Sequence, residues 1–160
     1  MKAKSGFTLV EILIVVVILG ILAAIVIPQF TEASTEAKLS SLCTDLQTVR
    51  SQIELYKVQH NDVAPAFATF VAQMTTYSDI DGATNATKDP ANGFIYGPYL
   101  QKIPVNQFND KQDVNGNGTL DNTGLSNDVG SWEYDPTTGI IHADDSYDKD
   151  GTPGADHANL

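Results

Sequence analysis

One carboxylate stands within a stretch of the sequence that is otherwise apolar. Glu11 is the only ionisable residue in the run 7–27, which is about as long as one helix that crosses a bilayer. A carboxylate is costly in hydrocarbon, and a buried charge needs a partner. Glu11 is therefore a candidate functional residue. The alternative is that it lies at the membrane interface of a single-pass anchor and has no further role.

A second group of oxygen-bearing residues has the spacing of a calcium loop. Asp113, Asn115 and Asn117 alternate ahead of a glycine, which matches the pattern D-x-[DN]-x-[DN]-G. Alternating oxygen ligands converge on one hard cation, while the glycine allows the sharp turn. The pattern departs from an EF-hand at Gly124, where the twelfth position lacks the bidentate Glu. Residues 126–132 can supply the missing oxygen, and the alternative is a solvated Asn/Gly turn.

Acidic residues are concentrated late in the chain, whose formal net charge is −11. Nucleic-acid binding needs a basic surface, so this charge argues against it. The run 144–151 is rich in Asp and could bind a second calcium ion, but a tail of this composition favours disorder.

The sequence contains no recognisable catalytic set. His60, His142 and His157 lie far apart without the spacing of metal ligands, and there is no nucleophile motif or glycine-rich phosphate loop. The single cysteine, Cys43, excludes an intrachain disulfide and is expected to pack as a small apolar side chain. A small domain without that cross-link can use a metal instead. We therefore predict a protein that is not an enzyme.

One long helix is predicted to carry Glu11 and to continue into a soluble domain, from Phe7 to about His60. Gly20 and Pro28 are its weak points, and because proline removes a backbone donor, a kink or local loosening is expected there. The alternative is that Pro28 separates two helices. In the second half, apolar residues recur at spacings of three and four, which indicates one face of an amphipathic helix. These residues are Leu39, Leu42, Leu46, Val49, Ile53 and Tyr56.

The rest of the chain predicts a short helix and a β-hairpin. Asn61, Asp62 and Pro65 are expected to end the long helix, and helical spacing predicts a second helix over 66–77. Alternating aromatic and polar residues predict a strand over 130–135, and a tight turn then leads into a second strand over 140–143. The segments 78–93 and 107–129 are predicted loops. The side chains expected to pack on the apolar face of the long helix are Trp132, Tyr134, Ile140 and Ile141.

These elements predict an α+β fold. A long N-terminal α-helix, with a membrane half and an amphipathic half, packs on a small antiparallel β-sheet with acidic loops. The expected divisions are a leader at 1–6, a transmembrane and assembly helix at 7–30, a globular domain at 31–144 and an acidic, flexible tail at 145–160.

The first 28 residues resemble the class III signal of the type IV pilin-like superfamily. A short basic leader ends in Gly6, Phe7 follows it, and Glu11 is the fifth residue after that glycine. The resemblance implies that a prepilin peptidase and methyltransferase cleaves between Gly6 and Phe7 and methylates the new Phe7 amine. The apolar run would then stay in the mature protein. In a filament of parallel helices, the α-amino group of Phe7 could pair with Glu11 of a neighbouring subunit.

Three further stretches, at 45–57, 97–100 and 132–143, resemble the major, G-type pseudopilin of type II secretion systems. That resemblance implies that the acidic loop before Trp132 holds calcium, and that Asp121 and Asp128 are the best-placed ligands. The further candidate ligands are Asp113, Asn115, Asn117 and Ser126.

The resemblance implies a structural subunit of a secretion pseudopilus. It would wait as a single-pass protein in the bacterial inner membrane with its globular domain in the periplasm. Its partners would be other copies of itself, other pseudopilins and an inner-membrane assembly platform, and the product would be a periplasmic filament that drives protein export. One alternative is a type IV pilus major pilin for adhesion, motility or DNA uptake. Another is a membrane-anchored, calcium-dependent binding module that no peptidase processes.

Overall fold

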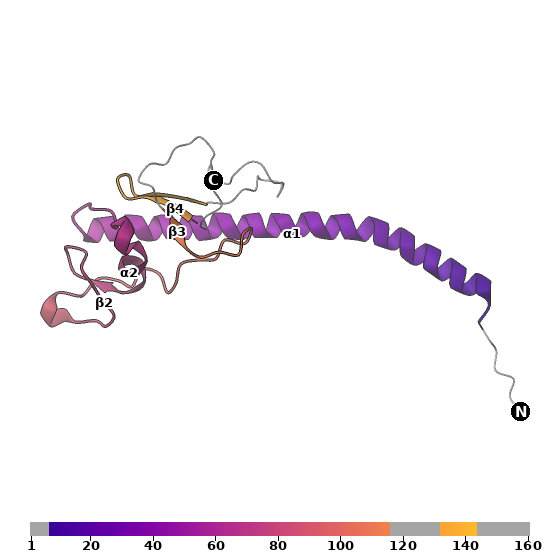
Figure 1. Cartoon of the computed structure of the whole chain (residues 1–160), viewed down its shortest axis with the longest axis horizontal. Helices are drawn as coiled ribbons and strands as arrows, with labels where there is room; N and C mark the ends of the chain where they lie inside the picture. Colours follow the sequence, from indigo (N-terminus) through magenta and orange to yellow (C-terminus); the bar gives the residue numbers. More distant parts are fainter. Residues whose placement is uncertain (1–6, 116–131, 144–160) are drawn as a thin grey trace, which may run out of the picture. The chain divides into compact units, whose positions relative to one another are not determined.

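The computed structural model describes residues 7–115 and 132–143, and the chain divides into two compact units, Met1–Ala37 and Lys38–Leu160. Figure 1 shows the elements along the chain. The helices are α1 (Leu9–Gln59), η1 (Phe67–Thr69), α2 (Phe70–Thr75) and η2 (Pro90–Asn92). The strands are β1 (Tyr77–Ser78), β2 (Thr84–Asn85), β3 (Val114–Asn115), β4 (Trp132–Asp135) and β5 (Ile140–Ala143).

Helix α1 confirms the long helix predicted from the sequence. Pro28 lies inside it, so the alternative of two helices separated by this proline is wrong. Pro28 has no N–H to donate to the carbonyl of Ala24. One turn further on, the Thr31 hydroxyl donates to the carbonyl of Ile27 at 3.1 Å. The helix therefore continues through a position where one backbone bond is missing.

The C-terminus of α1 is closed by the residues that the sequence indicated. Asn61 has φ 55° and Asp62 has φ 65°, in the left-handed region that ends many helices. The N–H of Asp62 donates to the carbonyl of Lys57 at 2.8 Å, which is the bond that characterises a Schellman cap. Asparagine and aspartate tolerate this conformation better than most residues, which explains why the helix stops here.

The core of the second unit forms on one stripe of α1. Leu42, Leu46, Val49, Ile53 and Tyr56 are all buried, as the spacing predicted. Leu39 is only half-buried, so the buried stripe begins one turn later than expected. The residues that complete the core come from α2, from the segment 100–103 and from the sheet. They are Phe70, Met74, Leu100, Ile103, Trp132, Tyr134, Ile141 and Ala143.

The predicted hairpin is confirmed as β4 and β5, which pair antiparallel from Trp132↔Ala143 to Asp135↔Ile140. A third strand, β3, joins β4 in parallel with Val114 opposite Trp132. The described residues thus form a sheet in the order β3-β4-β5. The sequence analysis placed β3 in a loop, because two residues are too few to show an alternating pattern.

The turn between β4 and β5 is built around Asp135. Its carboxylate accepts hydrogen bonds from the Thr137 N–H and the Thr138 hydroxyl, both at 2.8 Å, and from the Thr137 hydroxyl. Gly139 has φ 74° and donates its N–H to the Asp135 carbonyl at 2.8 Å. The bond from the Thr137 hydroxyl lowers the pKa of Asp135 most, because it stabilises the ionised carboxylate.

One packing prediction for this hairpin is wrong. Ile141 is fully buried, but Ile140 is 44% exposed. Successive side chains of a strand point to opposite faces, so two neighbouring isoleucines in β5 cannot both face the core. Trp132 and Tyr134, which are two residues apart in β4, are both fully buried as expected.

The segment between α1 and β3 contains more structure than the sequence suggested. The second helix is shorter than 66–77, because the chain enters it through η1 and Tyr77 already belongs to β1. Strands β1 and β2 pair antiparallel, with Tyr77 opposite Asn85, inside a region predicted mostly as loop. Gln73 holds this region together, since its side chain accepts from the Ala66 N–H and donates to the Gly82 carbonyl, both at 2.8 Å.

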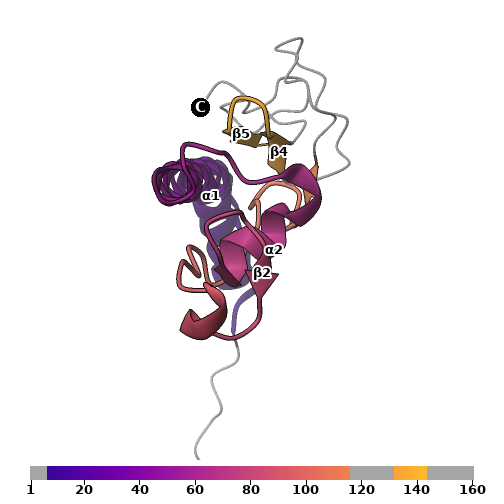
Figure 2. The same cartoon turned by 90° about the vertical axis from the view of Figure 1, so that its left-hand side faces the viewer.

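Figure 2 shows α2 and the β4–β5 hairpin beside the C-terminal part of α1. Arg50 of α1 donates from Nε and Nη2 to the carbonyl of Ile141 in β5, at 3.2 and 3.0 Å. The Tyr134 hydroxyl donates to the Pro65 carbonyl at 2.7 Å, and the Trp132 indole donates to the Pro104 carbonyl at 2.8 Å. These bonds attach the sheet to α1 and to both flanking segments.

Candidate functional site

The side chain of Glu11 is hydrogen-bonded to Thr8 of the same chain, at the N-terminus of α1. The N–H and the hydroxyl of Thr8 both donate to the same oxygen of Glu11, at 2.8 and 2.7 Å. The Glu11 N–H donates back to the Thr8 hydroxyl at 3.3 Å. This reciprocal arrangement is a capping box, with Thr8 as the N-cap and Glu11 three residues later. Among the described residues, the Glu11 carboxylate therefore has hydrogen-bond partners but no cationic one.

Thr8 is a residue that the sequence analysis overlooked. Its signal was present, because a Thr followed three residues later by a Glu ahead of an apolar run is the pattern of a capping box. Phe7 lies just outside α1 and is 81% exposed. Gly6, on the other side of the expected scissile bond, lies outside the described residues. On the described side of that bond, an exposed residue without regular secondary structure precedes a capped helix.

The N-terminal half of α1 exposes its apolar side chains on every side. From Leu9 to Phe30, each large apolar residue has at least half of its surface exposed. The helix is long and apolar enough to cross a membrane. A Cβ at Gly20 would meet no atom within 4 Å, so nothing else in the described chain packs against that position. This helix surface needs a membrane or other chains to cover it.

The candidate calcium ligands are only partly visible. Asp113 and Asn115 are described, whereas Asn117, Asp121, Ser126 and Asp128 lie outside the described residues. The parallel pairing of β3 with β4 brings the two ends of segment 116–131 together, since the Trp132 N–H donates to the Asp113 carbonyl at 3.2 Å. A parallel connection needs a long crossover, and here that crossover carries the other four candidates.

Of the two described candidates, Asp113 is exposed and Asn115 is half-buried. Val114, between them, packs against the core. Neighbouring side chains of a strand alternate, so Asn115 of β3 is expected on the face opposite to Val114. Carboxylate and amide oxygens are the donors that calcium prefers. No group of three metal-ligating side chains occurs among the described residues, so these two alone would not hold the ion.

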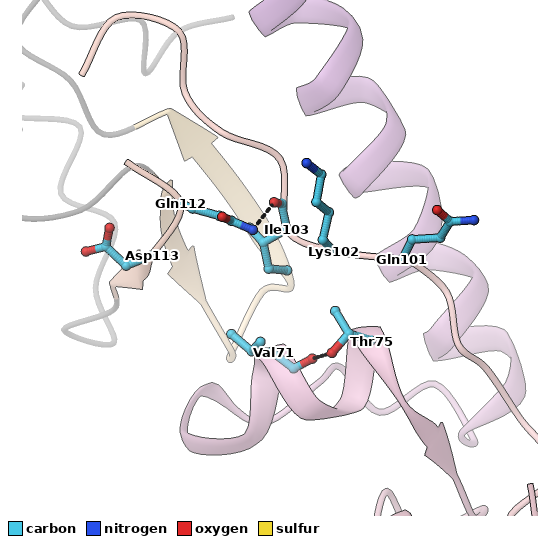
Figure 3. A pocket seen from close by; sticks show the side chains of 7 residues that line it. All are labelled: Val71, Thr75, Gln101, Lys102, Ile103, Gln112 and Asp113. Carbon is cyan, nitrogen blue, oxygen red and sulfur yellow. Dashed lines mark hydrogen bonds between the residues drawn. The ribbon is translucent and has the colours of Figure 1, made fainter. Parts of the chain in front are cut away.

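A groove of about 450 Å³ lies beside Asp113, between α2 and the segment 101–103 (Figure 3). Gln112 crosses it and donates from Nε2 to the Ile103 carbonyl at 2.8 Å. Lys102 and Asp113 are the ionisable residues of its lining.

The histidine that directly follows α1 has a packing role. His60 is 2% exposed, its Nδ1 lies 2.8 Å from the Tyr56 carbonyl and its Nε2 lies 3.0 Å from the Ser78 hydroxyl. Its ring stacks on Tyr56 with centroids 3.7 Å apart. Both ring nitrogens of His60 are thus occupied within the chain.

The comparisons with known proteins agree on one family. Residues 1–27 match the family described as "Prokaryotic N-terminal methylation motif". The chain is 35% identical to the type II secretion system core protein G of Pseudomonas aeruginosa over 107 residues, which is 67% of this chain and 70% of that protein. It is 29% identical to the protein of the same name from Vibrio cholerae over 147 residues, which cover 82% of this chain and 94% of the relative.

A fimbrial protein of Pseudomonas aeruginosa is also similar, with 41% identity, but over only 54 residues and 35% of its length. No solved structure matches the chain significantly. The similarity to core protein G thus extends well beyond the N-terminal motif, whereas the similarity to the fimbrial protein is confined to about a third of either chain. The chain belongs to the family of the type II secretion system core protein G, the major pseudopilins.

Proposed function

We propose that this chain is made as an inner-membrane precursor and becomes the repeating structural subunit of a type II secretion pseudopilus. The observation that carries the proposal is its match to core protein G over two thirds of both chains, together with the N-terminal methylation motif. In this role it is a scaffold and not an enzyme. A type IV pilus major pilin is less favoured, because the fimbrial relative matches over a shorter segment.

In the proposed processing step, a prepilin peptidase removes residues 1–6 by cleaving between Gly6 and Phe7. The exposed position of Phe7 outside α1 supports this, because a peptidase needs access to backbone that is not part of a helix. Methylation of the new amine of Phe7 would keep its positive charge. The mature chain would then begin immediately before the capping box of Thr8 and Glu11.

Assembly would cover the apolar surface of α1. Each large apolar side chain gains roughly 1.5–3 kcal/mol when it leaves water, so this helix is stable only in a bilayer or against other helices. When α1 leaves the bilayer and enters a filament, its side chains move from one apolar environment to another. The transfer therefore carries no large hydrophobic penalty. Other copies of this chain, other pseudopilins and an inner-membrane platform would be the partners.

Glu11 would set the position of each subunit in the filament. Its carboxylate bonds to Thr8 in the single chain, and both bonds are to neutral donors. The amine of Phe7 from a neighbouring subunit would add the opposite charge that a buried carboxylate needs. We propose that α1 loosens at Gly20 and Pro28 during assembly. At Pro28 the helix already lacks one backbone hydrogen-bond donor.

The remaining segments follow from this role. Residues 7–30 would form the membrane and assembly segment, residues 31–144 the globular domain in the periplasm, and residues 145–160 an acidic, flexible tail. We also propose that calcium binds segment 113–128. Support for this comes from the exposed position of Asp113 and from the β3–β4 pair, which brings the two ends of the loop together.

The test of the proposed function is a variant that blocks processing. Gly6→Val should leave the precursor in the inner membrane, abolish filament assembly and stop export of the system's substrates. Ser5→Ala, one residue earlier, is the matched control and should behave as the parent. Normal export by Gly6→Val would contradict the proposal, and it would favour a membrane-anchored binding module.

A further inference from the structure

The hydroxyl of Tyr56 is buried and has no partner in the described part of the chain. Tyr56 is 2% exposed, yet no hydrogen bond joins its hydroxyl to another described residue. Two other tyrosines show the usual arrangement, since Tyr134 donates to the Pro65 carbonyl and Tyr99 to Gln59 Oε1, both at 2.7 Å. Buried polar groups are almost always hydrogen-bonded, so the Tyr56 hydroxyl needs an explanation.

The surroundings of this hydroxyl come from three segments. Its ring stacks on that of His60, the residue that follows α1. Its oxygen faces Gly82, where a Cβ would lie only 2.7 Å from both the Tyr56 oxygen and Gln73 Nε2. Gln73 Nε2 uses one hydrogen for the Gly82 carbonyl at 2.8 Å, which leaves its second hydrogen available. Two polar groups therefore converge between α1, α2 and the turn from β1 to β2.

A cavity of about 200 Å³ lies beside these groups, and Tyr56, Gln73 and Asp81 are among the residues that line it. A water molecule in a protein needs about 30 Å³ and two to four polar partners, so the space is sufficient. Burial, Tyr99 and Asp79 together raise the pKa of Tyr56 to about 12. The hydroxyl is therefore protonated at physiological pH and can donate a hydrogen bond.

We propose that this cavity is a hydration site, in which an ordered water accepts a hydrogen bond from the Tyr56 hydroxyl and bonds to the amide of Gln73. The water would satisfy the one buried tyrosine hydroxyl that lacks a protein partner in the described chain. It would also connect α1, α2 and the β1–β2 turn. Bulk water would exchange with the site past the exposed carboxylate of Asp81.

A pair of matched variants of the full chain in detergent micelles tests this. Tyr56→Phe removes the hydroxyl proposed to bond to water, and Tyr134→Phe removes one that bonds to the chain itself. Both variants should melt a few degrees below the parent. Unfolding is monitored by the fluorescence of the buried Trp132. A melting temperature of Tyr56→Phe equal to or above that of the parent would overturn the proposal, because deleting an unsatisfied hydroxyl relieves a cost.

A direct measurement complements the variants. In the parent protein, the hydroxyl proton of Tyr56 should exchange slowly and show a nuclear Overhauser effect to water, and Tyr56→Phe should abolish that signal. The hydroxyl proton of Tyr134, which bonds to a carbonyl, serves as the reference for a buried group without water. A Tyr56 hydroxyl proton that is visible but has no contact with water would overturn the hydration site.

Discussion

Thr8 and Glu11 bond to each other three times in the first turn of α1, at distances between 2.7 and 3.3 Å. The carboxylate proposed to pair with a neighbouring subunit is therefore already satisfied within its own chain. This arrangement allows a single subunit to wait in the membrane without an unpaired carboxylate. Assembly would add the amine of a neighbouring Phe7 to the group.

The charge of Glu11 is predicted to matter for assembly and not for membrane insertion. Glu11→Gln keeps a side chain of the same size that accepts from Thr8 but removes the attraction for an amine. The variant should be inserted and processed as the parent is, while filament yield falls severely. Filament yield can be measured by shearing assembled filaments from cells that overproduce the protein. Parent-like yield would exclude the proposed charge pairing.

The hydroxyl of Thr8 is predicted to hold the first turn of the helix. Thr8→Val has a similar shape but loses the cap, which typically costs about 1 kcal/mol. Amide hydrogen exchange at Glu11 and Ile12 should become several times faster in micelles, with no change in the second unit. Thr8→Ser retains the hydroxyl and should exchange as the parent does. Equal exchange in all three proteins would show that the capping box does not stabilise the helix.

Much of this fold could be predicted because long periodic segments carry a strong signal. The stripe from Leu42 to Tyr56 indicated α1, Asn61 and Asp62 marked its end, and the alternation at Trp132 and Tyr134 indicated β4. Strands β1, β2 and β3 have two residues each, too few for an alternating pattern. They are defined by their pairing, Tyr77 with Asn85 and Val114 with Trp132, and alternation within one strand does not report such pairing.

The candidate sites likewise include residues that the sequence indicates and features that only the structure reveals. Glu11 was evident because a carboxylate in an apolar run is conspicuous, but its partner Thr8 was overlooked, although the two residues have the spacing of a capping box. Tyr56 was predicted as a core residue, and the position of its ring confirms this. The lack of a partner for its hydroxyl depends on where Gly82 and Gln73 lie, and no spacing in the sequence contains that information.

Calcium is predicted to stabilise the globular domain. Excess EGTA should lower the melting temperature of the full chain in micelles, because an ion that binds only the native state adds about 2.7 kcal/mol at one hundred times its dissociation constant. Asp121→Ala should melt at the lower temperature and lose its response to EGTA. Asp148→Ala, in the acidic tail, is the matched control. A melting curve that EGTA does not shift would remove calcium from this account.

Asp135 is predicted to make the domain sensitive to acid. Its folded-state pKa is lowered, chiefly by the Thr137 hydroxyl. A lowered pKa contributes stability that is present above the unfolded-state value of about 4 and is lost as the pH falls through the folded-state pKa. Thr137→Val should raise the Asp135 pKa and shift acid unfolding to higher pH. The carboxyl chemical shift measures this directly, and an unchanged titration would refute it.

The most direct test of the central claim is the N-terminus of the mature protein isolated from cells with a complete secretion system. Mass spectrometry of its N-terminal peptide should show a chain that begins at Phe7 and carries a methyl group on its α-amine. A strain without the prepilin peptidase should contain only the chain that keeps residues 1–6. A mature protein that retains Gly6 in the complete strain would contradict processing, and with it the pairing of Phe7 with Glu11.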